Sequence, residues 1–230
     1  MVKIDSEFPI QTSANIEGFL LSNAGGEACG GKFEEAFAES CNSVFAPLGV
    51  KVGAKRLVQM AERFGFNGSP GIPGAERSQI PSAETIGGDL DVGSSAIGQG
   101  KVQSTVLQMA SAGASVATGG LRYPPTLDAA VRPKPTRIMR RSTAITMRRL
   151  MVGVVKGGTG KAAQINGVKV AGKTGTAELG GGLTDDAWFV AFAPAIRPKL
   201  VVGVLLVQAG FGGDVAAPAA RDVLVKGLGK

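Results

Sequence analysis

The sequence predicts an α+β domain in which helices flank an antiparallel β-sheet. Three apolar runs in the last third of the chain, residues 168–174, 187–193 and 200–208, have the composition of strands. A Gly-rich stretch joins the first two runs, and a Pro-bounded turn joins the last two. Because a parallel return needs a crossover of a dozen or more residues, strands joined so briefly are expected to run antiparallel.

Helical patterns precede and follow these strands. Residues 32–40 place apolar side chains at i, i+3 and i+4, which predicts a short helix that ends near Ser40. After a polar break the helical pattern resumes with one apolar face. That face consists of Leu57, Met60, Ala61 and Phe64. The further expected helices are residues 43–50, 54–66, 104–118 and 214–229.

Two stretches lack any regular pattern. Residues 8–31 are expected to be loop with at most a short hairpin. Residues 67–100 are rich in Gly, Ser and Pro, which predicts a long irregular region of the kind that often covers a site. No repeat or linker divides the chain, so we expect one domain, residues 1–230.

The composition excludes several kinds of active site. The 230 residues contain no histidine, so a Ser-His-Asp triad, a Cys-His pair and His-ligated zinc are impossible. Cys29 and Cys41 are too few for a four-ligand zinc site and can form one disulfide at most. That bridge would suit an exported protein, but Cys41 could equally be a small buried side chain. We expect no metal and no cofactor, and proton transfer is left to lysine, serine, tyrosine, cysteine or carboxylates.

The net charge of +7 comes from one segment. Residues 132–149 carry seven Lys and Arg and no acid, and the other 18 cations balance the 18 Asp and Glu. Clustered arginine is typical of nucleic-acid binding, but the segment lacks the interleaved aromatic side chains of single-strand binders. We therefore expect no nucleic-acid partner and interpret the segment as a solvated face, or one attracted to anionic wall polymers or lipid headgroups.

Targeting signals are absent from the sequence as written. No apolar run reaches the roughly 18 residues of a membrane span, and residues 1–9 lack the charged-then-apolar pattern of a signal peptide. The chain is expected neither to span a membrane nor to export itself. Either it is cytoplasmic, or it is a piece of a longer protein whose targeting segment lies elsewhere.

Two motifs compete for the residues around Lys173. Residues 167–174 match the phosphate-loop pattern G-x-x-x-x-G-K-[ST] letter for letter, which would indicate an NTPase. That mechanism requires a helix to begin at the lysine so that backbone N–H groups face the phosphates. Here the middle residues alternate like a strand, and the Gly-rich sequence that follows is a poor start for a helix. We therefore favour the other match.

That second match combines Lys173-Thr174-Gly175-Thr176 with Ser40-Cys41-Asn42 at the break between two helices. Together they fit the K-T-G and S-x-N elements of serine acyl-transfer enzymes. Such chemistry uses a serine hydroxyl beside a lysine to relay protons, an amide to hold a peptide bond, and cationic and hydroxyl groups to bind a carboxylate. Ser40 and Asn42 could alternatively be ordinary helix caps.

The order of several longer blocks resembles the transpeptidase domain of penicillin-binding proteins, which cross-link peptidoglycan and bind β-lactams. The blocks are EAFAESCNSVFAPLG, IGQGKVQSTVLQMA, VVKGGTG, VAGKTGTAE and AWFVAFAP. The likeness covers residues 20–228 and corresponds to the C-terminal part of that domain. It implies the penicillin-binding, β-lactamase-like fold with a helical subdomain, and a parent protein on the extracytoplasmic face of the cell membrane. Its ligand would be a peptidoglycan stem peptide or a β-lactam.

The resemblance also implies roles for six residues. Ser40 would relay a proton towards the leaving amine, and Asn42 would orient the substrate amide. Lys173, Thr174 and Thr176 would hold the terminal carboxylate, with the Thr176 N–H in the oxyanion hole. Gly175 would let the strand backbone lie close to an extended substrate.

One departure from the family bears on activity. The family nucleophile is the serine of an S-x-x-K motif that precedes S-x-N, and this sequence contains no S-x-x-K. The chain is therefore expected to be an N-terminally truncated transpeptidase domain that is inactive alone, with the missing N-terminal segment as a candidate partner. Two alternatives stay open: a non-catalytic pseudo-enzyme that binds the peptide or β-lactam, and, less favoured, a P-loop NTPase.

Overall fold

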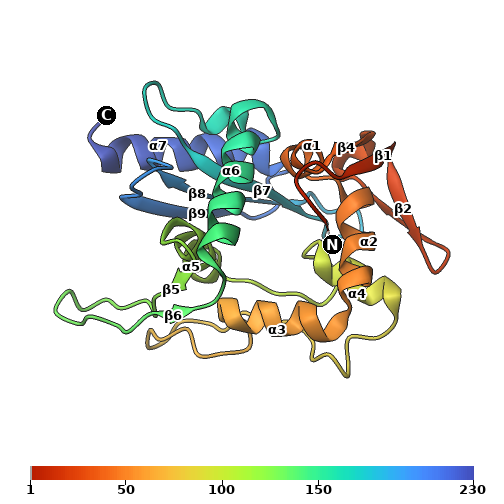
Figure 1. Ribbon diagram of the computed structural model, residues 1–230, viewed down its shortest axis with the longest axis horizontal. Helices are drawn as coiled ribbons and strands as arrows, with labels where there is room; N and C mark the ends of the chain where they lie inside the picture. The colour runs from red at the N-terminus through yellow and green to blue at the C-terminus, as the bar shows by residue number, and fades with distance from the viewer. Residues whose placement is uncertain (1) are drawn as a thin grey trace.

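A three-stranded antiparallel sheet in the order β7-β8-β9 organises the computed structural model, which describes residues 2–230 (Figure 1). Its strands are β7 (Ala171–Ala177), β8 (Asp186–Ala193) and β9 (Leu200–Leu206). The predicted antiparallel order is confirmed. The first strand was predicted three residues too early, because Gly167 has a positive φ of 73° and residues 165–168 form a tight turn. Residues 207–208 lie beyond the last strand.

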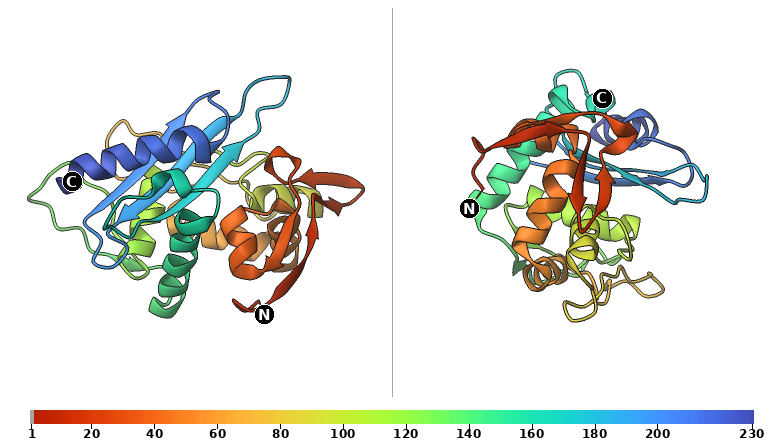
Figure 2. Two further views of the ribbon diagram at one scale, coloured as in Figure 1. Left: turned by 90° about the horizontal axis from the view of Figure 1, so that it is seen from above. Right: turned by 90° about the vertical axis from the view of Figure 1, so that its right-hand side faces the viewer.

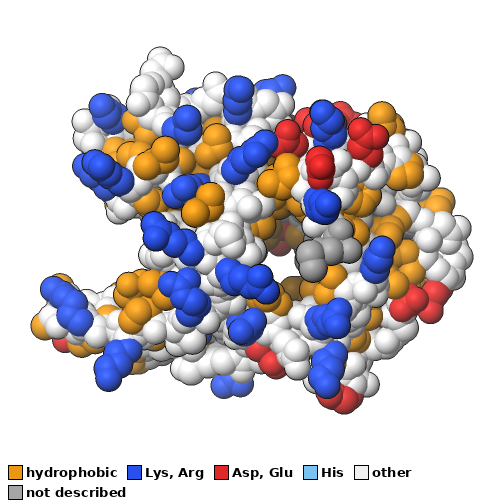
Figure 3. All heavy atoms as spheres, in the orientation of Figure 1, with side chains coloured by type: hydrophobic (Ala, Val, Ile, Leu, Met, Phe, Trp, Pro, Cys, Tyr) orange, Lys and Arg blue, Asp and Glu red, His pale blue; other side chains and the backbone are white. Residues whose placement is uncertain are grey.

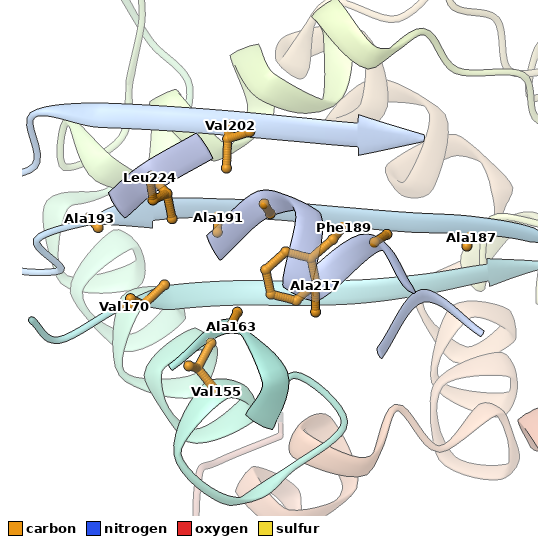
Figure 4. Close-up of a cluster of buried hydrophobic side chains, with 12 residues drawn as sticks. Val155, Ala163, Val170, Ala187, Phe189, Ala191, Ala193, Val202, Ala217 and Leu224 are labelled. Carbon is orange, nitrogen blue, oxygen red and sulfur yellow. The ribbon is translucent and has the colours of Figure 1, made fainter. Parts of the chain in front are cut away.

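Helices cover both faces of this sheet (Figure 2). Helix α7 (Ala217–Leu228) packs along β8 and β9, and α5 (Val106–Ala117) and α6 (Arg141–Gly157) pack against the opposite face. Alternate residues of β8 point to the two sides, so Phe189 faces α7 (Figure 4). Phe192 lies on the other side, in the cluster with α6 residues. Since both faces are buried, the strand is a nearly continuous apolar run.

The predicted helix, polar break and further helix are confirmed near the N-terminus. The elements are α1 (Phe33–Glu39), α2 (Asn42–Val52) and α3 (Ala54–Phe64). Leu57 and Ala61 pack in a core with buried Val58, as the periodicity predicts. Met60 was wrongly placed on this face, since its side chain is 40% exposed.

Two predictions of irregular structure hold only in part, although the short hairpin allowed within residues 8–31 is present at residues 13–22. Residues 67–100 include a helix, α4 (Asp89–Ala96), which packs against α2. Residues 8–31 contain strands that pair as β1 with β4 and β2 with β3. The strands are β1 (Glu7–Gln11), β2 (Ser13–Ile16), β3 (Phe19–Ser22) and β4 (Cys29–Lys32). Pairing of β1 with β4 joins segments distant in sequence, so no local pattern indicated it.

The basic segment contributes to a long helix and a projecting arm. Strands β5 (Leu121–Arg122) and β6 (Thr136–Arg137) form the base of the arm, and α6 begins shortly after it. The helix was not predicted, because the first half of its sequence is dominated by the cations. Six of the seven cations in residues 132–149 are exposed. Figure 3 shows Lys and Arg side chains spread over this face, in agreement with a solvated surface.

Short turns complete the backbone. They are the 3₁₀ turns η1 (Ala24–Gly26) and η2 (Lys161–Ala163) and the π-helical turn η3 (Gly212–Ala216). Turn η3 leads directly into α7, so the predicted last helix is confirmed over most of its length. Within residues 2–230, none of the helices combines the length and apolar character needed to cross a bilayer.

Candidate functional site

Ser40 lies where α1 ends. Its backbone is left-handed, with φ 61° and ψ 45°, and its N–H donates to the carbonyl of Phe37 at 3.3 Å. A left-handed residue commonly ends a helix, because it turns the chain away from the helix axis. Cys41 then serves as the N-cap of α2, without a side-chain hydrogen bond. The Ser40 hydroxyl is therefore not used as a helix cap, and it is available to the site.

Lys173 on β7 meets this hydroxyl. Its Nζ donates to Ser40 Oγ at 2.6 Å and to the backbone carbonyl of Thr174 at 3.0 Å. The ammonium also lies 5.9 Å from the centroid of the Phe37 ring, within the range of a cation–π contact. The fold thus joins two residues that are 133 positions apart in the sequence.

Burial lowers the pKa of Lys173 from its usual 10.5 to about 8. A buried ammonium loses hydration, which disfavours the charged form. With a pKa near neutrality, the amine can both accept and return a proton in the physiological range. The Ser40 hydroxyl is the group positioned to exchange that proton.

Thr174 connects the strand to the end of α1. Its side chain is buried, and its Oγ1 lies 2.6 Å from Oγ1 of Thr159. Thr159 in turn donates its N–H to the carbonyl of Ala38 at 3.1 Å, and its hydroxyl lies 3.3 Å from the same carbonyl. The two walls of the site are therefore bridged by hydrogen bonds beside the Lys173–Ser40 contact.

Gly175 and Thr176 continue the strand towards its end. The Gly212 N–H donates to Thr176 Oγ1 at 3.4 Å, and the Gln99 side chain donates to the Thr176 carbonyl at 3.4 Å. Gly175 lies opposite Trp188, where an added Cβ would lie 3.1 Å from the Trp188 Cβ. A side chain at position 175 would therefore require Trp188 to shift by a few tenths of an ångström.

Asn42 is held from the N-terminal strands. Its Nδ2 donates to the Ser22 carbonyl at 2.8 Å, and among residues 2–230 no hydrogen bond reaches its Oδ1. Cys41, between Ser40 and Asn42, forms a disulfide with Cys29 on β4. Of the two alternatives left open by the sequence, the structure has the bridge.

The phosphate-loop interpretation is wrong. Lys173 lies inside strand β7, which continues to Ala177, so no helix begins at the lysine. Strand β7 pairs with β8 on one side only, so its backbone N–H groups alternate between the sheet and the open edge instead of facing a common centre. Within residues 2–230 no cluster of three or more His, Cys, Asp and Glu could hold a metal ion.

Three residues around the site were not predicted. Phe37 was assigned only to the apolar face of α1, and Thr159 and Gln99 lay in two of the family-like blocks, VVKGGTG and IGQGKVQSTVLQMA, without an assigned role. Only the tertiary fold brings them to β7. The Gly-Gly-Thr-Gly run containing Thr159 was the single local signal, since glycines permit close approach of the backbone.

Comparison with known proteins places this architecture in a family. The family model described as "Penicillin binding protein transpeptidase domain" matches residues 5–225. The chain therefore belongs to the penicillin-binding transpeptidase family, as the sequence motifs indicated, and its fold class is confirmed.

Individual relatives agree with this assignment. Peptidoglycan D,D-transpeptidase PbpA of Mycobacterium tuberculosis is 35% identical over 235 residues, which cover 90% of this chain and 47% of that protein. The D,D-transpeptidase domain of a peptidoglycan glycosyltransferase from Eggerthella lenta superposes with a TM-score of 0.90 at 31% identity, covering 98% of this chain and 60% of that chain. The penicillin G acyl-enzyme complex of M. tuberculosis penicillin-binding protein A has a TM-score of 0.85 at 31% identity. The match covers 99% of this chain and 57% of that chain. The chain spans about half the length of the curated PbpA relatives that it matches.

Proposed function

We propose that residues 1–230 are one partial transpeptidase domain, and that they form two walls of a site that binds the D-Ala-D-Ala end of a peptidoglycan stem peptide, or a β-lactam. The observation that carries the proposal is the 2.6 Å hydrogen bond from Lys173 to Ser40. It joins the two motif elements of the family in one place. In the complete enzyme, the reaction would be cross-linking of peptidoglycan through a serine acyl-enzyme.

Ser40 and Lys173 are the residues that would transfer protons. The amine, with its pKa lowered to about 8 by burial, is partly neutral near physiological pH and can exchange a proton with the hydroxyl. A hydroxyl held between the lysine and the leaving amine can accept one proton while it donates another. Ser40 therefore acts as a relay without needing to become an alkoxide.

Carboxylate binding falls to Lys173, Thr174 and Thr176. The ammonium supplies charge, and hydrogen bonds to a charged acceptor are stronger than neutral ones. Because Gly212 donates to Thr176 Oγ1, the proton of that hydroxyl is left for an acceptor such as a carboxylate. Thr174 gains the same capacity when the Thr159 hydroxyl turns from the Ala38 carbonyl to donate to it. The Thr176 N–H would contribute to the oxyanion hole, and Gly175 would keep the strand open to an extended substrate.

Asn42 would orient the substrate amide. Since Nδ2 is engaged with the Ser22 carbonyl, the amide group is fixed in orientation and its Oδ1 can accept from a substrate N–H. The assignment of oxygen and nitrogen follows from that backbone carbonyl, which can only accept.

The chain alone is proposed to be inactive. Its sequence contains no S-x-x-K, so it offers neither the family nucleophile nor the lysine that activates it. Loss of a nucleophile typically lowers turnover by about six orders of magnitude. The partner it needs is an N-terminal segment of the same domain, in a parent protein on the extracytoplasmic side of the membrane.

A labelled penicillin tests this proposal. Incubation with the chain should give no covalent adduct, whereas a fusion of the chain behind the N-terminal portion of M. tuberculosis PbpA should be labelled. A stable adduct on the isolated chain would show that a nucleophile was overlooked. Lys173→Ala in the fusion should abolish labelling, and Lys169→Ala, at an exposed lysine nearby, should leave it unchanged.

A non-catalytic binding module is the second candidate, because the carboxylate-binding residues of β7 are all present in this chain. Titration of the isolated chain with acetylated Lys-D-Ala-D-Ala, followed by NMR, distinguishes the two. Saturable binding lost in Lys173→Ala, together with a folded fusion that stays unlabelled, would favour the module. Absence of any binding by the isolated chain would exclude it.

A further inference from the structure

We propose that the Cys29–Cys41 disulfide is a positioning element that holds Ser40 against Lys173, so that the contact between these two side chains persists only while the bridge is closed. The inference deepens the proposed function, on which its catalytic meaning rests. Its structural content is independent of any ligand and can be tested without one.

The bridge lies inside the motif itself. Cys41 separates Ser40 from Asn42, and its side chain is completely buried in a small core with Ala36 and Val44. Its partner, Cys29, is 12 positions earlier in the chain, with 5.8 Å between the two Cα atoms. No other covalent link joins the turn to a neighbouring element.

The turn requires an external restraint. Ser40 is not glycine, and a residue with a side chain holds the left-handed conformation only where the surroundings enforce it. The backbone bonds at this position run from Ser40 to Phe37 and from Cys41 to Ala36, and both acceptors belong to α1. Helix α1 has only seven residues; its packing on α6 and the Thr159 hydrogen bonds to Ala38 hold the helix, but the turn that follows takes its last restraint from outside it.

The start of α2 is restrained differently. The Ser43 N–H donates to the Asn23 side chain at 2.8 Å, and Asn23 donates to the carbonyls of Gln11 and Glu27. Asn42 is bonded to Ser22. These hydrogen bonds hold the side of the turn that carries Asn42. On the side that carries Ser40, the covalent link to the N-terminal strands is the disulfide, which adds to the packing of α1 against β4.

Strand β4 gives the bridge a firm anchor. Cys29 is itself in the ladder with β1, opposite Gln11. The bridge therefore ties Cys41, the residue next to Ser40, to a strand that is itself held in place by pairing. Opening it should free Ser40 and leave the hydrogen bonds around Asn42 in place.

The test compares the oxidised and reduced full-length chain by NMR. Dithiothreitol supplies two electrons: its thiolate attacks the Cys29 sulfur, Cys41 leaves as thiolate, and the second thiol closes the cyclic disulfide of the reagent. Cys29 is partly exposed, so the attack is possible there. We expect the NOE between Lys173 Hε and Ser40 Hβ to disappear on reduction and to return on reoxidation.

Hydrogen exchange distinguishes a local release of the turn from a general loss of stability. Exchange of the Ser40 and Cys41 amides should accelerate by roughly tenfold or more, while amides of Phe189 and Ala191 on β8 change by less than about twofold. Cys29→Ser combined with Cys41→Ser should reproduce the reduced state without reagent.

Three results would overturn the inference. The first is an NOE that persists in both the reduced chain and the double variant. The second is equal acceleration of exchange at Ser40 and throughout β8. The third is unfolding of the whole chain on reduction, because a positioning role requires that the sheet persist. None of these results depends on whether penicillin labels the fusion protein, so the inference and the proposed function can fail separately.

Discussion

The two walls of the site are held in place by different forces. The strand wall, residues 171–177, lies in a sheet whose neighbouring strand β8 is buried on both faces by helices. The turn wall, residues 40–42, rests on a short helix, a small core and one disulfide. The comparison teaches that Lys173 is positioned by a strand within the hydrophobic core, whereas Ser40 is positioned by a short helix packed on that core, a covalent link and a few polar contacts.

Phe189→Ala should have the largest effect, because it removes the main support of the strand wall. Phe189 is 1% exposed and lies against Gly160 and Gly172. Loss of a buried phenylalanine typically costs about 3–5 kcal/mol through lost burial and the cavity left behind. Urea denaturation measures the change. Phe19→Ala is the matched control, since Phe19 is 62% exposed and its truncation should cost less than about 0.5 kcal/mol. Equal losses of unfolding free energy in the two variants would show that packing around Phe189 does not dominate the stability of the sheet.

Lys173→Met should remove a pH dependence of stability. The folded pKa of Lys173 is about 8 and its ordinary value is 10.5. Between these values the unfolded chain binds the proton more tightly, so the free energy of unfolding rises with pH. The destabilisation that comes from burying the charged Lys173 amine is fully present below pH 8 and absent above pH 10.5. We expect the difference in unfolding free energy between the native chain and the variant to change by about 3 kcal/mol between pH 8 and pH 10.5.

The control for this prediction is Lys169→Met, at an exposed lysine two residues before β7. It should leave the pH dependence of unfolding unchanged. If native chain and Lys173→Met show parallel curves from pH 7 to 11, Lys173 is not buried as described.

Gly212→Ala should disturb the site from the side of η3. An added Cβ would collide with the carbonyl oxygens of Gly175 and Trp188, and backbone atoms cannot turn aside as a side chain can. Forced overpacking typically costs about 1–3 kcal/mol. Gly153→Ala, inside α6 with no atom within 4 Å of the new methyl group, should instead stabilise by about 0.5–1 kcal/mol. Thermal unfolding should show a lower melting temperature for Gly212→Ala and a higher one for Gly153→Ala.

Arg149→Ala should have the smallest effect. Arg149 pairs with Glu34 of α1 at 3.0 Å, but the two side chains are 64% and 41% exposed. Exposed ion pairs contribute about 0–1 kcal/mol because solvent screens them. We expect little change in unfolding free energy and no loss of the Lys173–Ser40 NOE. A loss of that NOE would mean that the ion pair, and not the bridge, positions the turn wall.

The sequence allowed more to be predicted of the strand wall than of the turn wall. Strand β8 was predicted almost to the residue, because an apolar run buried on both faces is a strong local signal. Helix α6 was missed because cations occupy its exposed side, and β1 with β4 because their pairing is not local. The pairing of Ser40 with Lys173 was expected from the motifs, and the fold brings them together. The contribution of Thr159 depends on contacts between distant segments, which no pattern around it encodes.

The most direct test of the account is an NMR titration of Lys173 in the isolated chain, with its Cε and Nζ shifts followed from pH 6 to 12. Burial against the turn wall predicts a midpoint of about 8, well below the 10.5 of an ordinary lysine. A midpoint near 10.5 would contradict the account, because it would mean that the amine is hydrated instead of buried against the turn wall.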